Sequence, residues 1–376
     1  MATVIAPATR SVERTPSAQE RLFSLDLFRG ITIAAMIVVN NQSSDEAFWP
    51  LQHAQWNGWT PTDLIFPFFL FIVGVSLVFS CHARLDRGDS RRALVLHALR
   101  RSAILFAIGL ALNGLAGVPI GSWRIPGVLQ RIAVVYCAAT LITLFSKIPG
   151  RIAWIASLLI GYWVLMRFVP VPGFGVPGRD IPLLHPDANL TAYLDRKLLF
   201  GHLWEGTRDP EGILSTLPAI ATALCGVLTG EWLRSERSPT KKLQAMFLYG
   251  LAGLVAGELW GIWFPINKKL WTSSYVVFTA GCALIGLAFC YWLTDIRRRR
   301  GRWTTPFLIF GTNAITAYVI SELVGGWLSW RGYTFLHSLA WLDSAALASL
   351  AHSLVVLILC FIPVWVLYRK RIFLKV

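Results

Sequence analysis

The chain has 376 residues, of which 55% are hydrophobic and only 15% charged, and its mean hydropathy is +0.56. Soluble domains carry about 25% charged residues, so this composition excludes an ordinary soluble protein, a disordered or fibrous chain and a disulfide-stapled module. The formal net charge of +15 comes from short Lys and Arg clusters between apolar runs, which favours contacts with membrane lipids over a nucleic-acid partner.

Apolar stretches long enough to cross a bilayer recur along the chain. About 20 residues of helix span the roughly 30 Å of hydrocarbon in a membrane. Ten segments meet this length, near residues 26–44, 63–82, 99–118, 127–146, 152–169, 213–233, 244–264, 273–294, 306–328 and 346–368. We therefore predict an all-α, polytopic integral membrane protein of about ten transmembrane helices over residues 23–376. Residues 1–22 lack a signal-peptide pattern and are expected to form a disordered cytoplasmic tail.

The distribution of basic residues predicts the orientation of these spans. Most of the 35 Lys and Arg fall in the N-terminal tail, in alternate connections and behind the last span. Because cytoplasmic segments are enriched in Lys and Arg, we predict that both termini are cytoplasmic. Two outer loops then stand out: residues 41–62, which contain no Lys or Arg, and the long Pro- and Gly-rich loop at about 170–211. Together they are expected to roof a site open to the outside.

Candidate reactive residues begin at the end of the first span. Asn40 and Asn41 lie there, where an amide can orient an imidazole, donate to an oxyanion or simply cap the helix. His53 follows in an aromatic loop, and an imidazole can take or give a proton near neutral pH. The alternative for His53 is a structural histidine at the membrane interface. Asp63 begins the second span and is a further catalytic candidate, although a carboxylate there can also simply cap the helix or orient His53.

Basic side chains form a second group of candidates. Arg124 and Arg131 bracket a Pro-Gly entry into the fourth span. Arginine offers paired donors to phosphate or carboxylate, although long basic side chains also reach to lipid headgroups. Lys268 lies in an outer loop against the topology rule, which favours an anionic ligand. Asp209 and Glu211, before the sixth span, either cap that helix or hold a cationic amine.

Further polar and aromatic residues near or within spans are candidates for substrate contacts. They are Trp56, Asn57, Glu258, Asn267 and Asn313. A proton relay and paired polar groups in the core are alternatives for the ionisable and amide members of this set. The sequence contains no HExxH, P-loop or GxSxG motif, and its six cysteines lie in apolar stretches. We therefore predict neither a metal site nor a disulfide framework.

Several sequence blocks resemble the heparan-α-glucosaminide N-acetyltransferase family. They are DLFRG at 26–30, HAQWNGWTPTDLIFPFFLFIVGVS at 53–76, RIPGVLQRIAVVY at 124–136, DPEGIL at 209–214, NKKLWTSSYV at 267–276, and the segments around Asn40 and Asn313. The resemblance runs from about residue 22 to the C-terminus. It implies a multi-span enzyme that transfers acetyl from acetyl-CoA to the amine of a glucosamine on the far side of the membrane. The large extracytoplasmic N-terminal domain of the lysosomal member is expected to be absent.

The resemblance also implies roles for particular residues. His53 corresponds to the active-site histidine, as general base or acetyl carrier, and Asn40 to the asparagine that orients it or donates to an oxyanion. Charge alone suggests that Arg124, Arg131 and Lys268 contact phosphates or glycan. The expected partners are acetyl-CoA as co-substrate, an amino-sugar glycan of a bacterial envelope and lipids of the bacterial inner membrane.

The family's dimer is a further expectation, and small-residue pairs such as Gly253 and Gly257 favour close helix packing, within or between copies. Two other functions stay open at this point. One is a transporter for a sugar or an acyl carrier, although no internal repeat is evident. The other is a structural membrane protein without chemistry. A transporter moves its substrate intact, whereas an acetyltransferase releases CoA and depends on His53.

Overall fold

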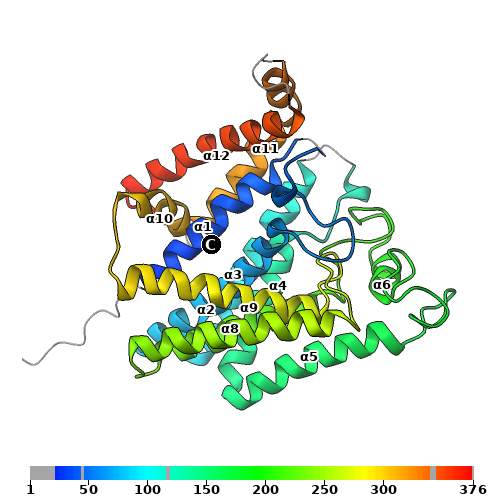
Figure 1. Ribbon diagram of the computed structural model, residues 1–376, viewed down its shortest axis with the longest axis horizontal. Coiled ribbons are helices and arrows are strands. Elements are labelled where there is room, and N and C mark those ends of the chain that lie inside the picture. The colour runs from blue at the N-terminus through cyan, green and yellow to red at the C-terminus, as the bar shows by residue number, and fades with distance from the viewer. Residues whose placement is uncertain (1–21, 44–45, 116–118, 339–343, 375–376) are drawn as a thin grey trace, which may run out of the picture.

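A computed structural model describes residues 22–43, 46–115, 119–338 and 344–374. This part of the chain is helical, apart from two isolated β-bridges in the loop after α5 (Figure 1). The helices are α1 (Phe23–Asn40), α2 (Ile65–Leu85), α3 (Arg91–Gly114), α4 (Val128–Phe145), α5 (Ile148–Phe168), α6 (Leu190–Leu198), α7 (Thr216–Arg234), α8 (Pro239–Gly261), α9 (Ser273–Tyr291), α10 (Thr305–Thr312), α11 (Ala314–His337) and α12 (Ala345–Arg369). Single turns η1 (Trp49–Leu51) and η2 (Pro61–Leu64) interrupt the loop before α2.

The number of spans agrees with the prediction. Nine helices of the described chain are long and apolar enough to cross a membrane, and the bent pair α10–α11 makes a tenth candidate. The predicted span over 306–328 is wrong in one respect, because α10 and α11 meet at an 82° bend. Asn313 leaves the helical conformation there, and its amide donates to the Ile372 carbonyl at 3.2 Å and accepts from the Leu374 N–H at 2.9 Å. The Asn313 side chain thus ties the C-terminal segment to the break between α10 and α11.

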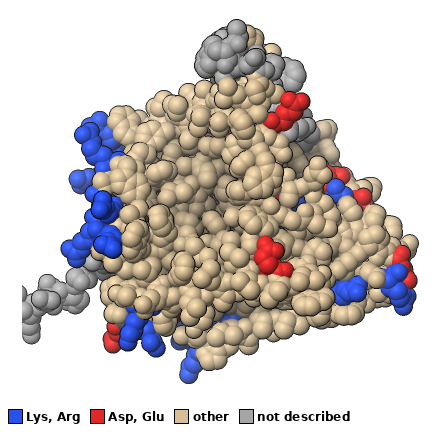
Figure 2. Space-filling view, viewed as in Figure 1, with Lys and Arg blue, Asp and Glu red and all other residues tan. Residues whose placement is uncertain are grey.

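Basic side chains gather at one end of the molecule. Figure 2 shows them along the edge where α1 begins, whereas the middle of the visible face is almost free of charge. The outer-loop candidate with α6 lies at the opposite end in Figure 1. This separation is the one expected of a chain that crosses a membrane with its basic end in the cytoplasm. Residues 1–21 of the predicted tail lie outside the described residues.

Glycines allow α2 and α7 to approach almost backbone to backbone. A Cβ atom on Gly74 would lie 1.9 Å from the carbonyl oxygen of Ala223, and one on Gly226 would lie 2.0 Å from that of Phe71. Small residues are the usual means of close helix packing in a membrane, where apolar burial from water gives no driving force between helices. The helix that follows Asp63 is therefore fixed against α7.

Gly253 and Gly257 have the same role between α8 and α9. A Cβ atom on Gly257 would lie 2.4 Å from the backbone nitrogen of Phe278, and one on Gly253 would lie 3.1 Å from the Cα atom of Gly281. The small-residue pair read from the sequence thus packs two helices of the same chain. It offers no support for the predicted homodimer, which stays a prediction.

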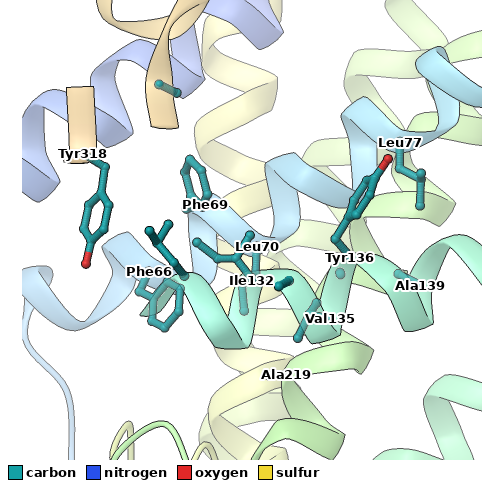
Figure 3. Packing of buried hydrophobic residues seen from close by; sticks show 14 of the residues in the cluster. Phe66, Phe69, Leu70, Leu77, Ile132, Val135, Tyr136, Ala139, Ala219 and Tyr318 are labelled. Carbon is teal, nitrogen blue, oxygen red and sulfur yellow. The ribbon is translucent and has the colours of Figure 1, made fainter. Parts of the chain in front are cut away.

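The central core joins α2, α4, α7 and α11. Figure 3 shows Phe66 and Leu70 of α2 facing Ile132 of α4, with Tyr318 of α11 pointing toward Phe66. A separate apolar cluster joins the loop after α5 to α5 itself and to the segment after α8, and in it the fully buried Tyr162 packs with Phe264. Packing of this density holds both α2 and the long outer loop in one arrangement, so the residues that they carry have defined positions.

Candidate functional site

His53, Asp63 and Lys268 meet just before α2. The His53 Nδ1 atom lies 2.8 Å from Asp63 Oδ1, and the Lys268 ammonium lies 3.4 Å from the same carboxylate oxygen and 3.0 Å from Nδ1. Asp63 is buried, whereas the His53 side chain is 48% exposed. All three were singled out in the sequence, but their meeting was not predictable, because 215 positions separate His53 from Lys268.

Two neighbours compete for His53 Nδ1, which can donate to Asp63 or accept from Lys268 but cannot do both. We assign the proton to Nδ1, because the 2.8 Å contact to the carboxylate, which can only accept, is the shorter of the two. Lys268 then pairs with the same carboxylate as an ion pair. Burial lowers the pKa of Lys268, against the opposing attraction of Asp63. Within the described chain, His53 Nε2 has no hydrogen-bond partner, so its lone pair faces outward and can accept a proton.

Asp63 is held rigidly by its own loop. Its second oxygen, Oδ2, accepts hydrogen bonds from the backbone N–H groups of Ala54 at 3.0 Å and Thr60 at 3.1 Å. The Thr60 bond closes the first turn at η2, which confirms the predicted helix cap, and the contact to Nδ1 places the same carboxylate where it can orient the histidine. The Tyr275 hydroxyl donates to the Asp63 carbonyl at 2.5 Å. Sequence reasoning overlooked Tyr275, although its block was noted.

Asn267 connects the two loops that carry the cluster. Its side-chain NH₂ donates to the Trp56 carbonyl at 2.9 Å and to Asn57 Oδ1 at 3.2 Å, while its Oδ1 accepts from the Leu270 N–H. Asn267 is fully buried. The predicted substrate contact is thus a buried brace between the loops of Lys268 and His53, and both hydrogens of its amide are already donated within the protein.

Trp56 lines a small pocket next to the cluster. Thr191, Glu205, Arg208, Asp209 and Lys269 are among its other lining residues. The Arg208 guanidinium lies 5.1 Å from the Trp56 ring centroid, and Glu205 pairs with both Arg208 and Lys269. The pocket has room for about one water molecule, and Arg208 and Lys269 both lie over the Trp56 ring.

Glu258 is connected by a hydrogen bond to Trp59, which lies in the same loop as His53. Its carboxylate accepts from the indole N–H of Trp59 at 3.1 Å, and the Trp59 ring packs on Phe278 with centroids 4.8 Å apart. Glu258 is exposed at this end of α8. Asn313, in contrast, lies at the α10–α11 break, where the C-terminal segment occupies its amide. The structure therefore does not bring Asn313 to the His53 cluster.

Arg124 is held by two carboxylates of the DPEGIL block. It makes paired hydrogen bonds to Asp209 at 2.8 and 2.6 Å, and it also bonds Glu211. Although burial opposes the shift, these bonds raise the pKa of Arg124. The Asp209 side chain is fully buried. Both alternatives considered for Asp209 and Glu211, a helix cap and a cationic amine, are replaced by this ion pair.

We expect that Arg124→Ala lowers the free energy of unfolding by about 3–5 kcal/mol, because it leaves the buried Asp209 carboxylate unpaired. Arg124→Lys keeps the charge but loses the paired geometry, and it should show an intermediate loss. Thermal unfolding in detergent measures both. The matched control is Arg179→Ala, which breaks the exposed Arg179–Asp180 pair and should leave the melting temperature nearly unchanged. Equal shifts for Arg124→Ala and the control would contradict the assignment.

Arg131 is buried one turn into α4. Its Nη2 atom donates to the Gly212 carbonyl at 3.2 Å and to the Ser215 hydroxyl, and its guanidinium lies 5.1 Å from the Trp271 ring centroid. Two other nitrogens, Nε and Nη1, have no hydrogen-bond partner in the described chain. Arg131 thus keeps unpaired donors inside the protein, whereas Arg124 and Lys268 lie against carboxylates that offset their charge.

The amides at the end of α1 have separate roles. Asn41 donates to the Ile37 carbonyl at 2.7 Å and Gln42 donates to the Val38 carbonyl at 2.9 Å, so these two side chains cap the helix. Asn40 is exposed and makes no hydrogen bond within the described chain. The simple capping explanation therefore applies to Asn41, and Asn40 is left available for another partner.

Asp195 of α6 was overlooked in the sequence. It is fully buried, and its Oδ1 atom accepts from the Ile213 N–H at 2.9 Å while Oδ2 has no partner. Burial, opposed by the Ile213 hydrogen bond and reinforced by the charge of Asp209, raises the pKa of Asp195 to about 6. A lone acidic residue in an amphipathic loop helix gives no sequence signal of this kind.

The raised pKa predicts a pH-dependent stability. The folded chain binds this proton more tightly than the unfolded chain, so stability is full below pH 4 and falls by about 2–3 kcal/mol as pH rises to about 6. Asp195→Asn should abolish this component. The measurement is the difference in melting temperature between the two proteins from pH 4 to pH 8, which cancels other titrating groups. A difference that does not vary with pH would rule the prediction out.

Comparisons with known proteins agree with the blocks noted in the sequence. Residues 21–257 match the family model described as heparan-alpha-glucosaminide N-acetyltransferase, catalytic. The chain is 32% identical over 428 residues to the heparan-alpha-glucosaminide N-acetyltransferase of Homo sapiens, covering 99% of this chain and 62% of that protein. It is 31% identical over 418 residues to the Mus musculus protein, covering 97% and 62%. The chain thus spans about three fifths of the length of these relatives.

Proposed function

Because this chain belongs to the heparan-alpha-glucosaminide N-acetyltransferase family, we propose that it transfers acetyl from acetyl-CoA to the amine of a glucosamine-containing sugar at the membrane. The observation that carries this proposal is the cluster of His53, Asp63 and Lys268, in which a buried carboxylate orients an exposed imidazole. Residues 23–376 would form the acyltransferase domain. The site would face the extracytoplasmic side of a bacterial inner membrane, opposite the basic end of the molecule.

The chemistry needs a base next to an open space. The amine nitrogen of the acceptor attacks the thioester carbonyl carbon, a C–N bond forms and the C–S bond breaks as the CoA thiolate leaves. His53 Nε2 takes the proton that the nitrogen loses and returns it to the thiolate. Asp63 stabilises the imidazolium that forms meanwhile, and Lys268 prevents an excess of negative charge around Asp63.

A covalent route uses the same atoms. His53 Nε2 then attacks the thioester first, acetyl-histidine forms as the thiolate leaves, and the amine displaces the imidazole in a second step. Asn40 would donate its free amide to the carbonyl oxygen that becomes negative in either route. Arg131 would offer its unpaired Nε and Nη1 atoms to an oxygen of the donor's phosphates once the donor opens a path to this buried side chain, and Arg124 would offer its Nη1 group.

We place the acceptor sugar beside Trp56, with Asn57 and Glu258 at the edge of the site. The support is the half-buried indole of Trp56 beside the paired side chains of Glu205 and Lys269, which line the small pocket next to it. An amino sugar of the cell envelope is the natural candidate acceptor. Its amine must be neutral to attack, so the rate should rise with pH through the titration of the acceptor and of the base.

The test is acetyl-CoA turnover by purified protein in detergent or proteoliposomes. With glucosamine as acceptor, we expect release of CoA and N-acetylglucosamine in equal amounts. N-acetylglucosamine is the matched control acceptor, because it has the same ring but no free amine, and it should give no turnover. If folded protein gives no turnover with several amino sugars and instead carries intact sugar across a vesicle membrane, a transporter replaces the enzyme.

A further inference from the structure

The three residues after Asn40 are clasped by one face of α12. That face consists of three buried side chains that lie within about one turn of the helix, Ser349, His352 and Ser353. This stripe lies more than 300 positions from Asn40 along the chain and belongs to neither the His53 cluster nor the acceptor pocket. It therefore needs an explanation of its own.

The contacts are specific for the segment from Asn41 to Ser43. His352 Nδ1 lies 2.7 Å from the Ser43 hydroxyl and 3.1 Å from the Asn41 carbonyl oxygen. The Ser349 hydroxyl accepts from the Ser43 N–H at 2.9 Å. Gln42 is held as well, because its Oε1 accepts from Ser349 and its Nε2 donates to Ser353, both at 2.9 Å. Every residue of the segment is thus tied to α12.

A third helix closes the clasp from the other side. A Cβ atom on Gly325 of α11 would lie 2.0 Å from Asn41 Oδ1, so this side chain has no room to shift. His352 is only 1% exposed, and its other ring nitrogen, Nε2, has no partner in the described chain. Burial of an imidazole with one unpaired nitrogen costs free energy of folding, and an apolar residue at this position would avoid that cost. The presence of a histidine here is explained by its Nδ1 atom, which contacts Asn41 and Ser43.

We propose that His352 is a positioning residue for the acetyl transfer. By holding the Asn41–Ser43 segment, it fixes the exposed amide of Asn40 relative to the His53 imidazole. This inference rests on the proposed function, because it assigns Asn40 to the reacting site. His352 touches no reacting atom itself and acts only through the segment that it holds.

Two measurements test this inference. Hydrogen–deuterium exchange of residues 38–43 should increase in His352→Ala, whatever the activity. In the turnover assay, His352→Ala should lower kcat by about tenfold to a hundredfold, since small displacements of positioned groups have effects of this size. The KM for acetyl-CoA should stay within about twofold of wild type, because the clasp lies outside the predicted donor contacts.

Matched variants separate positioning from packing. His352→Asn keeps a hydrogen-bonding nitrogen near the Nδ1 position and should restore most of kcat, whereas His352→Gln places its amide near the Nε2 position and should not. Cys360→Ser alters another fully buried residue of α12 and should leave kcat unchanged. If His352→Ala does not fold, Ser349→Ala and Ser43→Ala remove contacts of the same clasp singly.

The outcomes are distinguishable. If wild type is inactive, the proposed function fails, but the exchange measurement still decides whether His352 holds the segment. The inference is overturned if exchange of residues 38–43 is unchanged, or if exchange rises while kcat of His352→Ala stays within twofold of wild type. Equal kcat values for His352→Asn and His352→Gln at equal melting temperatures would also overturn it.

Discussion

Replacement of His53 by alanine is expected to reduce acetyl transfer by about a thousandfold or more while the protein still folds. A positioned general base contributes 10²–10⁴-fold, and a covalent carrier is indispensable to its own route. The His53 side chain is 48% exposed, so its loss leaves no cavity in the core. The measurement is CoA release by the variant at saturating acetyl-CoA and glucosamine, with melting temperature recorded alongside.

The control for this prediction is His97→Ala, which removes a histidine from the N-terminal half of α3. This variant should retain wild-type turnover. The same experiment separates the two routes. Without acceptor, an acetyl-histidine route releases about one CoA per protein in wild type and none in His53→Ala, whereas direct transfer releases none in either. Near-normal turnover by His53→Ala would reject His53 as base and as carrier.

The second large effect is expected for Asp63→Asn, with a loss of about 10²–10⁴-fold in kcat. Two backbone N–H groups, of Ala54 and Thr60, point at Oδ2, so the oxygen of an asparagine amide must take that place. Its NH₂ group then faces His53 Nδ1 and donates to it. The imidazole must move its proton to Nε2, where the base is needed, and catalysis stops for lack of a lone pair.

The charge lost in Asp63→Asn also leaves the Lys268 ammonium without its nearest carboxylate, so a stability loss of about 1–2 kcal/mol should accompany the kinetic effect. Thr62→Val is the matched control. It removes a hydrogen bond from the Thr62 hydroxyl to the Pro50 carbonyl in the same turn, without touching His53. If both variants lose activity in proportion to their melting temperatures, the tautomer explanation is wrong.

The sequence predicted the helices better than it predicted the contacts between them. Hydrophobic length alone located the spans, because about 20 apolar residues have few alternatives to a membrane helix. The sequence did not predict the bend at Asn313. The Asn313 side chain there bonds to backbone groups of Ile372 and Leu374, which meet it only in the folded chain. A local pattern cannot reveal a partner some 60 positions away.

The candidate site shows the same difference, because the sequence identified its residues but not their contacts. Residue type and position marked His53, Asp63 and Lys268, but charge alone could not tell a free cation from a paired one. Arg124 was marked as an anion contact and already forms ion pairs with Asp209 and Glu211, whereas Arg131 has no carboxylate partner and keeps free donors. Asn267 likewise has the chemistry of a ligand contact, but it donates both amide hydrogens to the loop that carries Trp56 and Asn57. Which polar groups are already paired is a property of the fold.

Asp63 uses one oxygen for the turn that begins α2 and the other for the tautomer of His53. A residue without a side-chain acceptor at this position would therefore lose both the turn and the orientation of the imidazole. Asparagine separates the two properties, because its oxygen can keep the hydrogen bonds from Ala54 and Thr60 while its NH₂ group faces Nδ1. Saturation libraries scored for folding should thus accept asparagine at residue 63, whereas libraries scored for catalysis should accept only aspartate.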